Sequence, residues 1–175
     1  MLDKDSLITY ITEEEIQKTI RDLCREVEQD YQGEKVTLIC PLKGSIFFLS
    51  DFVRELKLQQ EIDFVQLSNR DKYGERGADI KFIQDISVDI SGRNVIIVEE
   101  IIDTARTLSF LKNRLLAAAP KSLKILTLLD KPARRVISLK PDYIGRTVED
   151  RYLIGYGMDQ EEEGRAFNQI YFLKS

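Results

Sequence analysis

The most informative feature of the sequence is an absence, because its 175 residues include no histidine. Histidine is the usual side chain for proton transfer near neutral pH and the commonest metal ligand. Its absence excludes histidine-based catalysis and histidine-ligated metals. Acid–base chemistry must fall to carboxylates, lysine or tyrosine. A bound metal should have oxygen ligands, with magnesium expected where phosphates are involved.

Cysteine is scarce and long apolar runs are missing. The two cysteines, Cys24 and Cys40, lie in apolar contexts, and two isolated thiols do not make a disulfide framework. No apolar run approaches the roughly 20 residues that a membrane span needs, and the start shows no signal-peptide pattern. We therefore expect a cytoplasmic protein that does not associate with membranes.

The composition is that of an ordinary globular chain, with 43% hydrophobic and 32% charged residues. No repeat, linker or low-complexity segment divides it, so we expect one domain, residues 1–175. The net charge of −4 argues against nucleic acid as the main partner.

The sequence between residues 94 and 108 is the most distinctive stretch. Val95–Val98 is an unbroken apolar run that predicts a strand buried on both faces, ending at the acids Glu99 and Glu100. A hydroxyl-bearing loop, Asp103–Thr107, then leads into apolar residues at helical spacing. The backbone N–H groups of such a loop and helix start attract anions, and adjacent acids can hold sugar hydroxyls or a hard cation. The stretch therefore predicts a phosphate-binding site.

The remaining pattern alternates strands and helices. Thr12 and Glu15 form a capping box for a helix that we expect to run to about Gln29, and a second helix opens at Ile46. This order predicts an α/β domain with a largely parallel sheet. The other expected strands cover residues 36–41, 62–68, 80–84, 123–129, about 143–145, 152–156 and 169–173.

Residues 69–78 are polar and contain two glycines. Their composition leaves two alternatives open, a solvated hairpin or a mobile lid.

Three polar segments follow the carboxyl ends of expected strands: Lys43, residues 99–107 and Lys131. Ligands of open α/β sheets bind at that edge. We therefore expect the three segments to converge on one site.

The sequence motif Glu99–Thr107 resembles that of the hypoxanthine/guanine branch of the type I phosphoribosyltransferases. The resemblance extends to Leu42–Ser45, Lys131, Tyr152–Asp159 and Arg165. The resemblance implies the fold of that family, a mostly parallel sheet flanked by helices. It also implies a small hood over the carboxyl edge, made from the N-terminal and C-terminal segments, and a mobile loop of about residues 68–79.

The resemblance further implies an activity in purine salvage. Such an enzyme transfers a 5-phosphoribosyl group from phosphoribosyl pyrophosphate to hypoxanthine or guanine, giving IMP or GMP and pyrophosphate with Mg²⁺. Family members are commonly homodimers or homotetramers. The implied substrate-binding residues are Lys43, Gly44, Glu99, Glu100, Asp103, Thr104, Ala105, Arg106, Thr107, Lys131, Tyr152, Leu153, Asp159 and Arg165.

Particular roles come with the resemblance. Asp103 would be the acid–base residue near purine N7, and Lys131 would donate to the purine 6-oxygen. Lys43, preceded by a peptide that is often cis, and Arg165 would meet pyrophosphate. The implied metal-linked acids are Glu99, Glu100 and Asp159, and the implied base-pocket residues are Tyr152, which stacks on the purine, and Leu153, whose backbone reads its edge.

Three positions depart from the family pattern. Glu100 replaces the usual aspartate, and Ala105 replaces the loop glycine. If position 105 needs a positive φ, alanine costs on the order of 1 kcal/mol there. Ser68-Asn69 stands where the mobile loop usually carries Ser-Tyr, with Tyr73 four residues further on.

Two other functions are compatible with the same motifs. An RNA-binding attenuation regulator on this fold also carries Thr-x-Arg-Thr, although the acidic net charge and the matches at Lys131 and Tyr152 count against it. An enzyme of the same chemistry that prefers xanthine differs only in how its pocket reads the base.

Overall fold

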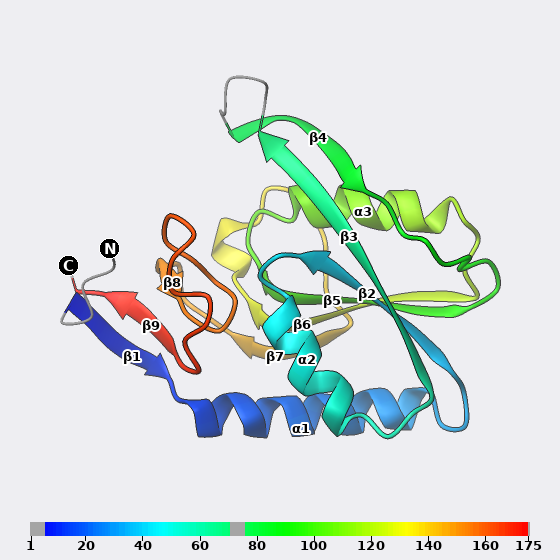
Figure 1. The fold of residues 1–175 in the computed structure, drawn as a ribbon, viewed down its shortest axis with the longest axis horizontal. Coiled ribbons are helices and arrows are strands. Elements are labelled where there is room, and N and C mark those ends of the chain that lie inside the picture. Colours follow the sequence, from blue (N-terminus) through cyan, green and yellow to red (C-terminus); the bar gives the residue numbers. More distant parts are fainter. Residues whose placement is uncertain (1–5, 71–75, 175) are drawn as a thin grey trace.

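The computed structural model describes residues 6–70 and 76–174, which form two sheets and three α-helices in those ranges (Figure 1). The larger sheet has the order β4-β3-β2-β5-β6-β7, and the smaller has the order β1-β9-β8. The strands are β1 (Leu7–Ile11), β2 (Val36–Leu42), β3 (Gln60–Arg70), β4 (Arg76–Gln84), β5 (Asn94–Ile102), β6 (Ser122–Asp130), β7 (Tyr143–Thr147), β8 (Leu153–Ile154) and β9 (Ile170–Leu173). The helices are α1 (Glu13–Asp30), α2 (Ile46–Glu55) and α3 (Arg106–Leu116), with a 3₁₀ turn at Pro132–Arg134.

The larger sheet is parallel except at one edge. β2 pairs in parallel with β3 and β5, and β6 pairs in parallel with β5 and β7. Only β4 runs antiparallel, against β3. The predicted α/β domain with a mostly parallel sheet is therefore confirmed.

β5 lies in the middle of this sheet and is buried on both faces, as predicted. Ile96 and Val98 face the cluster that includes α1 and α2, whereas Val95 and Ile97 face the cluster around α3. Figure 1 shows α1 and α2 on one face of the sheet and α3 on the other. All four side chains are fully buried, and each contributes about 1.5–3 kcal/mol of hydrophobic stabilisation.

The end of β5 differs from the prediction. The strand continues through Glu99 and Glu100 to Ile102, because its partner β6 is long enough to pair with it. Ile101 lies opposite Leu129 in that ladder. The loop after the strand is correspondingly short.

The start of α1 is the predicted capping box. The Glu15 amide donates to Thr12 Oγ1 at 3.3 Å, and the Thr12 amide donates to Glu15 Oε2 at 2.9 Å. The helix ends at Asp30, one residue beyond the expected boundary.

The polar segment after β3 is flanked by longer strands than predicted. Its described flanks form an antiparallel hairpin in which Ser68 lies opposite Lys81 and Arg70 opposite Arg76. The hairpin alternative therefore holds for the flanks. Residues 71–75, with Tyr73, lie outside the described residues, so the lid stays a prediction.

The smaller sheet joins the two ends of the described chain. β9 pairs antiparallel with both β1 and β8. Figure 1 shows this sheet beside the larger one, next to the loop between β8 and β9. None of the helices in the described ranges combines the length and the apolar character needed to cross a bilayer.

Candidate active site

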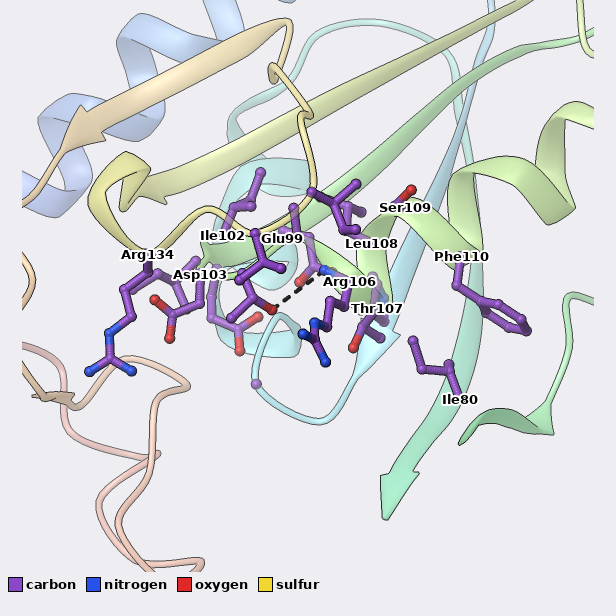
Figure 2. A pocket seen from close by; sticks show the side chains of 18 of the residues that line it. Ile80, Glu99, Ile102, Asp103, Arg106, Thr107, Leu108, Ser109, Phe110 and Arg134 are labelled. Atoms are coloured by element: carbon purple, nitrogen blue, oxygen red, sulfur yellow. Dashed lines mark hydrogen bonds between the residues drawn. The ribbon is translucent and has the colours of Figure 1, made fainter. Parts of the chain in front are cut away.

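A cleft of about 1100 Å³ lies at the carboxyl edge of the larger sheet. The ends of β2 and β5, the following loops and the start of α3 line it (Figure 2). Figure 2 shows Asp103 and Arg134 at one side of the cleft, and Phe110 with Ile80 at the other. The expected site residues that line it are Lys43, Gly44, Glu99, Glu100, Asp103, Thr104, Ala105, Arg106, Thr107 and Arg165. Lys131, Tyr152, Leu153 and Asp159 are not among its lining residues.

The turn after β2 is tightly packed at Gly44. A Cβ atom there would lie 2.0 Å from Glu100 Oε1, so a larger residue would displace that carboxylate. Gly157 has φ +101°, and a Cβ atom on it would lie 2.2 Å from the Gly44 carbonyl oxygen. Glycine at both positions lets the turn approach the loop after β8. The peptide between Leu42 and Lys43 is cis, as the resemblance implied.

The two acids at the end of β5 share one hydroxyl group. Ser45 is fully buried, and its Oγ lies 2.9 Å from Glu99 Oε2 and in hydrogen-bond contact with Glu100 Oε2. It also accepts a hydrogen bond from the Glu100 amide at 3.2 Å. A hydroxyl has one proton to donate, so it cannot satisfy both carboxylates. Ser45 was not among the predicted site residues, although it directly follows Lys43-Gly44.

Burial is the main electrostatic influence on this acid pair. It raises the pKa of Glu99 well above its usual value, and the neighbouring Glu100 charge raises it further. Burial also raises the pKa of Glu100, against the lowering effect of the Ser45 hydrogen bond and the Arg165 charge. Like charges held this close favour a cation or hydroxyl donors as partners. The pair is therefore suited to a divalent cation or to sugar hydroxyls.

The loop after β5 turns through a left-handed residue. Ala105 has φ 64° and ψ 8° and is only 5% exposed. Its carbonyl accepts the Ser109 amide at 2.9 Å in the first turn of α3. Thr104 Oγ1 accepts the Arg106 amide at 3.4 Å, the dashed line in Figure 2. Position 105 thus has the conformation in which alanine is strained, and the loop opens onto the helix N-terminus as predicted.

A second loop, after β6, holds this first loop in place. Arg135 Nη1 donates to the Asp103 carbonyl at 2.7 Å, while its Nη2 pairs with the buried Asp130 carboxylate. The amides of residues 136 and 137 both donate to the Thr104 carbonyl at 3.1 Å. Arg135 therefore fixes the backbone at Asp103. Sequence reasoning missed it, because nothing local marks Arg135 apart from Arg134.

Lys131 is a buried ammonium beside the Asp103 carboxylate. Its side chain is 6% exposed, and Nζ donates to the Arg151 carbonyl at 2.8 Å. Nζ also lies 3.5 Å from Asp103 Oδ1, an atom without a hydrogen-bond partner among the described residues. The Asp103 side chain as a whole is 47% exposed, on the cleft side. The structure thus brings these two predicted residues together.

The predicted base-pocket residues lie beyond the cleft. Tyr152 is 57% exposed and its hydroxyl donates to the Asp159 carbonyl at 2.8 Å, whereas Leu153 is buried in β8. The Asp159 carboxylate pairs with Arg165 at 2.8 Å. In the described part of the chain, no three metal-ligating side chains gather into one group, so Asp159 does not join Glu99 and Glu100.

Comparison with known proteins identifies the family to which this chain belongs. A family model described as the phosphoribosyl transferase domain matches residues 9–161. The hypoxanthine-guanine phosphoribosyltransferase of Bacillus subtilis is 36% identical over 174 residues, which cover 99% of this chain and 97% of that protein. The chain therefore belongs to the phosphoribosyltransferase family, in its hypoxanthine/guanine branch.

Solved structures agree with this assignment. The crystal structure of a hypoxanthine-guanine phosphoribosyltransferase from Bacillus anthracis matches with a TM-score of 0.88 and 39% identity, covering 96% of this chain and 97% of that one. A hypoxanthine phosphoribosyltransferase from Staphylococcus aureus matches with a TM-score of 0.92 and 33% identity, covering 97% and 93%.

One group of relatives is much longer. The bifunctional protein TilS/HprT of Listeria innocua is 37% identical over 164 residues, which are 94% of this chain and 25% of that protein. The chain thus spans a quarter of the length of these relatives.

The strain at Ala105 leads to a stability prediction. Replacing Ala105 with glycine relieves roughly 1–2 kcal/mol of left-handed strain, offset by the greater freedom of glycine in the unfolded chain, roughly 0.5–1 kcal/mol. We expect Ala105→Gly to leave the free energy of unfolding unchanged or slightly higher.

Ala117 provides the matched control, because it is exposed and has φ −63° at the end of α3. Ala117→Gly should lower the free energy of unfolding by about 0.5–1 kcal/mol. Urea denaturation of both variants measures the difference. An equal loss in the two would contradict strain at Ala105.

Proposed function

We propose that this protein transfers a 5-phosphoribosyl group from phosphoribosyl pyrophosphate to hypoxanthine or guanine, giving IMP or GMP and pyrophosphate in cytoplasmic purine salvage. The observation that carries the proposal is the position of Asp103. It lies between the left-handed loop at the start of α3 and the buried Lys131 ammonium, 3.5 Å away. An anion-binding loop and a purine-reading cation thus flank one carboxylate.

The 5′-phosphate binds at the loop after β5. Backbone amides of the loop from Asp103 to Thr107 and the N-terminal end of α3 supply hydrogen-bond donors and a positive dipole. The Thr104 and Thr107 hydroxyls and the Arg106 guanidinium add donors from side chains that line the cleft. Arg135 holds this loop in place by donating a hydrogen bond to the Asp103 carbonyl.

Glu99 and Glu100 would hold the ribose hydroxyls and a bound Mg²⁺ or its waters. The fit rests on the shared Ser45 hydroxyl, which has one proton for two carboxylates, and on the preference of magnesium for a few carboxylates plus waters and phosphates. Asp159, which pairs with Arg165 at 2.8 Å, would be a metal-linked acid near the exocyclic 2-position of the purine. When bound, magnesium supplies positive charge that stabilises the departing pyrophosphate.

Lys43 and Arg165 bind the pyrophosphate group from opposite loops. Loss of this group leaves an oxocarbenium-like ribose centre, as in glycoside cleavage. The two cations stabilise the charge that develops on the leaving oxygens. Because Gly44 has no side chain, the backbone of this turn packs directly against the Glu100 carboxylate at the cleft.

Lys131 reads the base, a nitrogen of the base bonds to the ribosyl carbon as the bond to pyrophosphate breaks, and Asp103 serves as the acid–base group near purine N7. An ammonium group only donates, so Lys131 suits a 6-oxo group and opposes a 6-amino group. Asp103 holds the proton of purine N7 as the new bond to ribose forms. Tyr152 stacks on the purine and the Leu153 backbone reads its edge.

We further propose how the rest of the chain assists. Residues 1–175 form one domain in which the smaller sheet and the β8–β9 loop act as the hood. Residues 68–79 close over the cleft and exclude water, which would hydrolyse the ribosyl intermediate. The protein assembles as a homodimer or homotetramer.

The two alternatives are not favoured. The full-length relatives reported above are named for hypoxanthine or guanine, not xanthine. An RNA-binding regulator has no need of a buried ammonium beside Asp103, which is an expensive arrangement unless it serves recognition.

A pyrophosphate-release assay tests the proposal directly. Phosphoribosyl pyrophosphate and magnesium are supplied with hypoxanthine, guanine, xanthine, adenine or uracil in separate reactions. We expect turnover with hypoxanthine or guanine. Turnover with xanthine alone would select the first alternative. If the folded protein releases no pyrophosphate with any of the five bases, the proposed activity is rejected.

The acid–base role of Asp103 predicts that its substitution lowers kcat without weakening the binding of phosphoribosyl pyrophosphate. Asp103→Asn should lower kcat about 100-fold or more while phosphoribosyl pyrophosphate still binds, because the amides of the loop are unchanged. Calorimetry measures the binding. Asp22→Asn, the same change on the surface of α1, is the control. An unchanged kcat would remove Asp103 from this role.

The recognition role of Lys131 predicts that its substitution impairs use of the purine base but not the binding of phosphoribosyl pyrophosphate. Lys131→Met keeps most of the buried volume but removes the donor, so kcat/KM for the purine should fall roughly 10- to 100-fold. Affinity for phosphoribosyl pyrophosphate should change little. Lys140→Ala, at an exposed lysine, is the control. Equal losses for both substrates would indicate a structural lysine instead.

A further inference from the structure

Glu162 lies between the two cations that the proposed function assigns to pyrophosphate. Its Oε2 atom is 3.1 Å from Lys43 Nζ and 3.3 Å from Arg165 Nη2. Lys43 belongs to the turn after β2, and Arg165 to the loop between β8 and β9. One carboxylate oxygen therefore joins two cations from loops far apart in the sequence, which is also what an oxygen of a bound diphosphate would do.

The backbone around Glu162 is unusual. Glu161 and Glu162 have φ values of 50° and 68°, in the left-handed region that non-glycine residues avoid. They are the central residues of a tight turn closed by reciprocal hydrogen bonds between Gln160 and Glu163, at 3.0 and 2.9 Å. Turns of this type favour asparagine and glycine at those positions. Both glutamates therefore adopt a backbone conformation that is unfavourable for residues with a side chain.

Other contacts aim the Glu162 side chain at the cations. The Glu162 amide donates to Asp159 Oδ2 at 2.9 Å. Arg165 Nη1 donates to the Gly157 carbonyl at 2.8 Å, and its Nη2 pairs with Asp159 Oδ1. The loop thus holds the arginine and the glutamate in fixed relation. Lys43, whose side chain is 60% exposed, completes the arrangement from the turn after β2.

We propose that Glu162 is a built-in competitor for the pyrophosphate position. With no diphosphate bound, its carboxylate pairs with Lys43 and shares with Asp159 the charge of Arg165. Phosphoribosyl pyrophosphate must displace the carboxylate to reach both cations, and the re-formed ion pairs help to expel pyrophosphate after reaction. Glu162 therefore lowers the affinity for both diphosphates. This inference rests on the proposed function, which places the pyrophosphate group on Lys43 and Arg165.

The test is calorimetric titration with pyrophosphate in the presence of magnesium. Glu162→Gln removes the charge and keeps the length of the side chain. We expect its dissociation constant for pyrophosphate to fall roughly three- to tenfold, the range for two partly exposed ion pairs. The KM for phosphoribosyl pyrophosphate should fall in parallel, and pyrophosphate should become a stronger product inhibitor.

Glu161→Gln is the matched control. It removes the same charge from the adjacent residue of the same turn, and Glu161 forms no ion pair with the rest of the described chain. A general loss of negative charge would affect both variants equally, and that result would overturn the proposal. Weaker or unchanged pyrophosphate binding in Glu162→Gln would also overturn it.

A second measurement tests whether Glu162 competes with pyrophosphate for Lys43. In a Lys43→Met background, Glu162→Gln should improve pyrophosphate binding less than it does in the natural protein, because one of the two cations has gone. An undiminished improvement would contradict the arrangement proposed here.

The outcomes separate this inference from the proposed function. Turnover with hypoxanthine or guanine but no difference between the Glu161 and Glu162 variants would reject only the competitor. If no base supports turnover, but pyrophosphate binds more tightly to Glu162→Gln and not to Glu161→Gln, only the proposed transfer reaction is rejected. If neither the natural protein nor the Glu162→Gln variant binds pyrophosphate, the competitor is rejected.

Discussion

The site depends above all on how β5 is held in the middle of the sheet. The strand pairs with β2 and β6 and is covered by helices on both faces. A shift of one residue would exchange its two buried faces, so its register is strongly constrained. Its carboxyl end consequently emerges at one defined point. Glu99, Glu100 and the loop to α3 therefore lie in fixed positions relative to the loops after β2 and β6.

Most of the charges at this edge are partly withdrawn from water, and a neighbouring loop supplies a partner for each. Ser45 contacts the glutamate pair, the Arg151 carbonyl accepts from Lys131, and the Asp103 carbonyl accepts from Arg135. An unpaired buried charge is costly, so these contacts make the loops depend on one another. The chemistry and the rigidity of the cleft come from the same interactions.

Conformational strain is concentrated in the same loops. Ala105 and Glu162 both have left-handed backbones, one in the loop at the helix N-terminus and the other beside Lys43 and Arg165. Strained residues tend to persist at functional sites, where the surrounding structure over-determines them. Here a left-handed residue leads the chain into the N-terminus of α3 in one case, and in the other it carries a carboxylate that contacts two cations.

The sequence by itself determined the order of strands and helices after Thr12, the capping box at Thr12, the doubly buried centre of β5 and the sheet edge to which Lys43 and Lys131 belong, but not β1, which precedes Thr12. These features depend on local periodicity and on strand ends, which are written in neighbouring residues. It did not determine the extension of β5 to Ile102, which requires pairing with β6. Nor did it identify the contacts of Ser45, Arg135 and Glu162, since Ser45 and Glu99 are 54 residues apart and Lys43 and Glu162 are 119 apart. Only the tertiary structure decides such contacts, because they exist only once distant loops have been brought to the same edge.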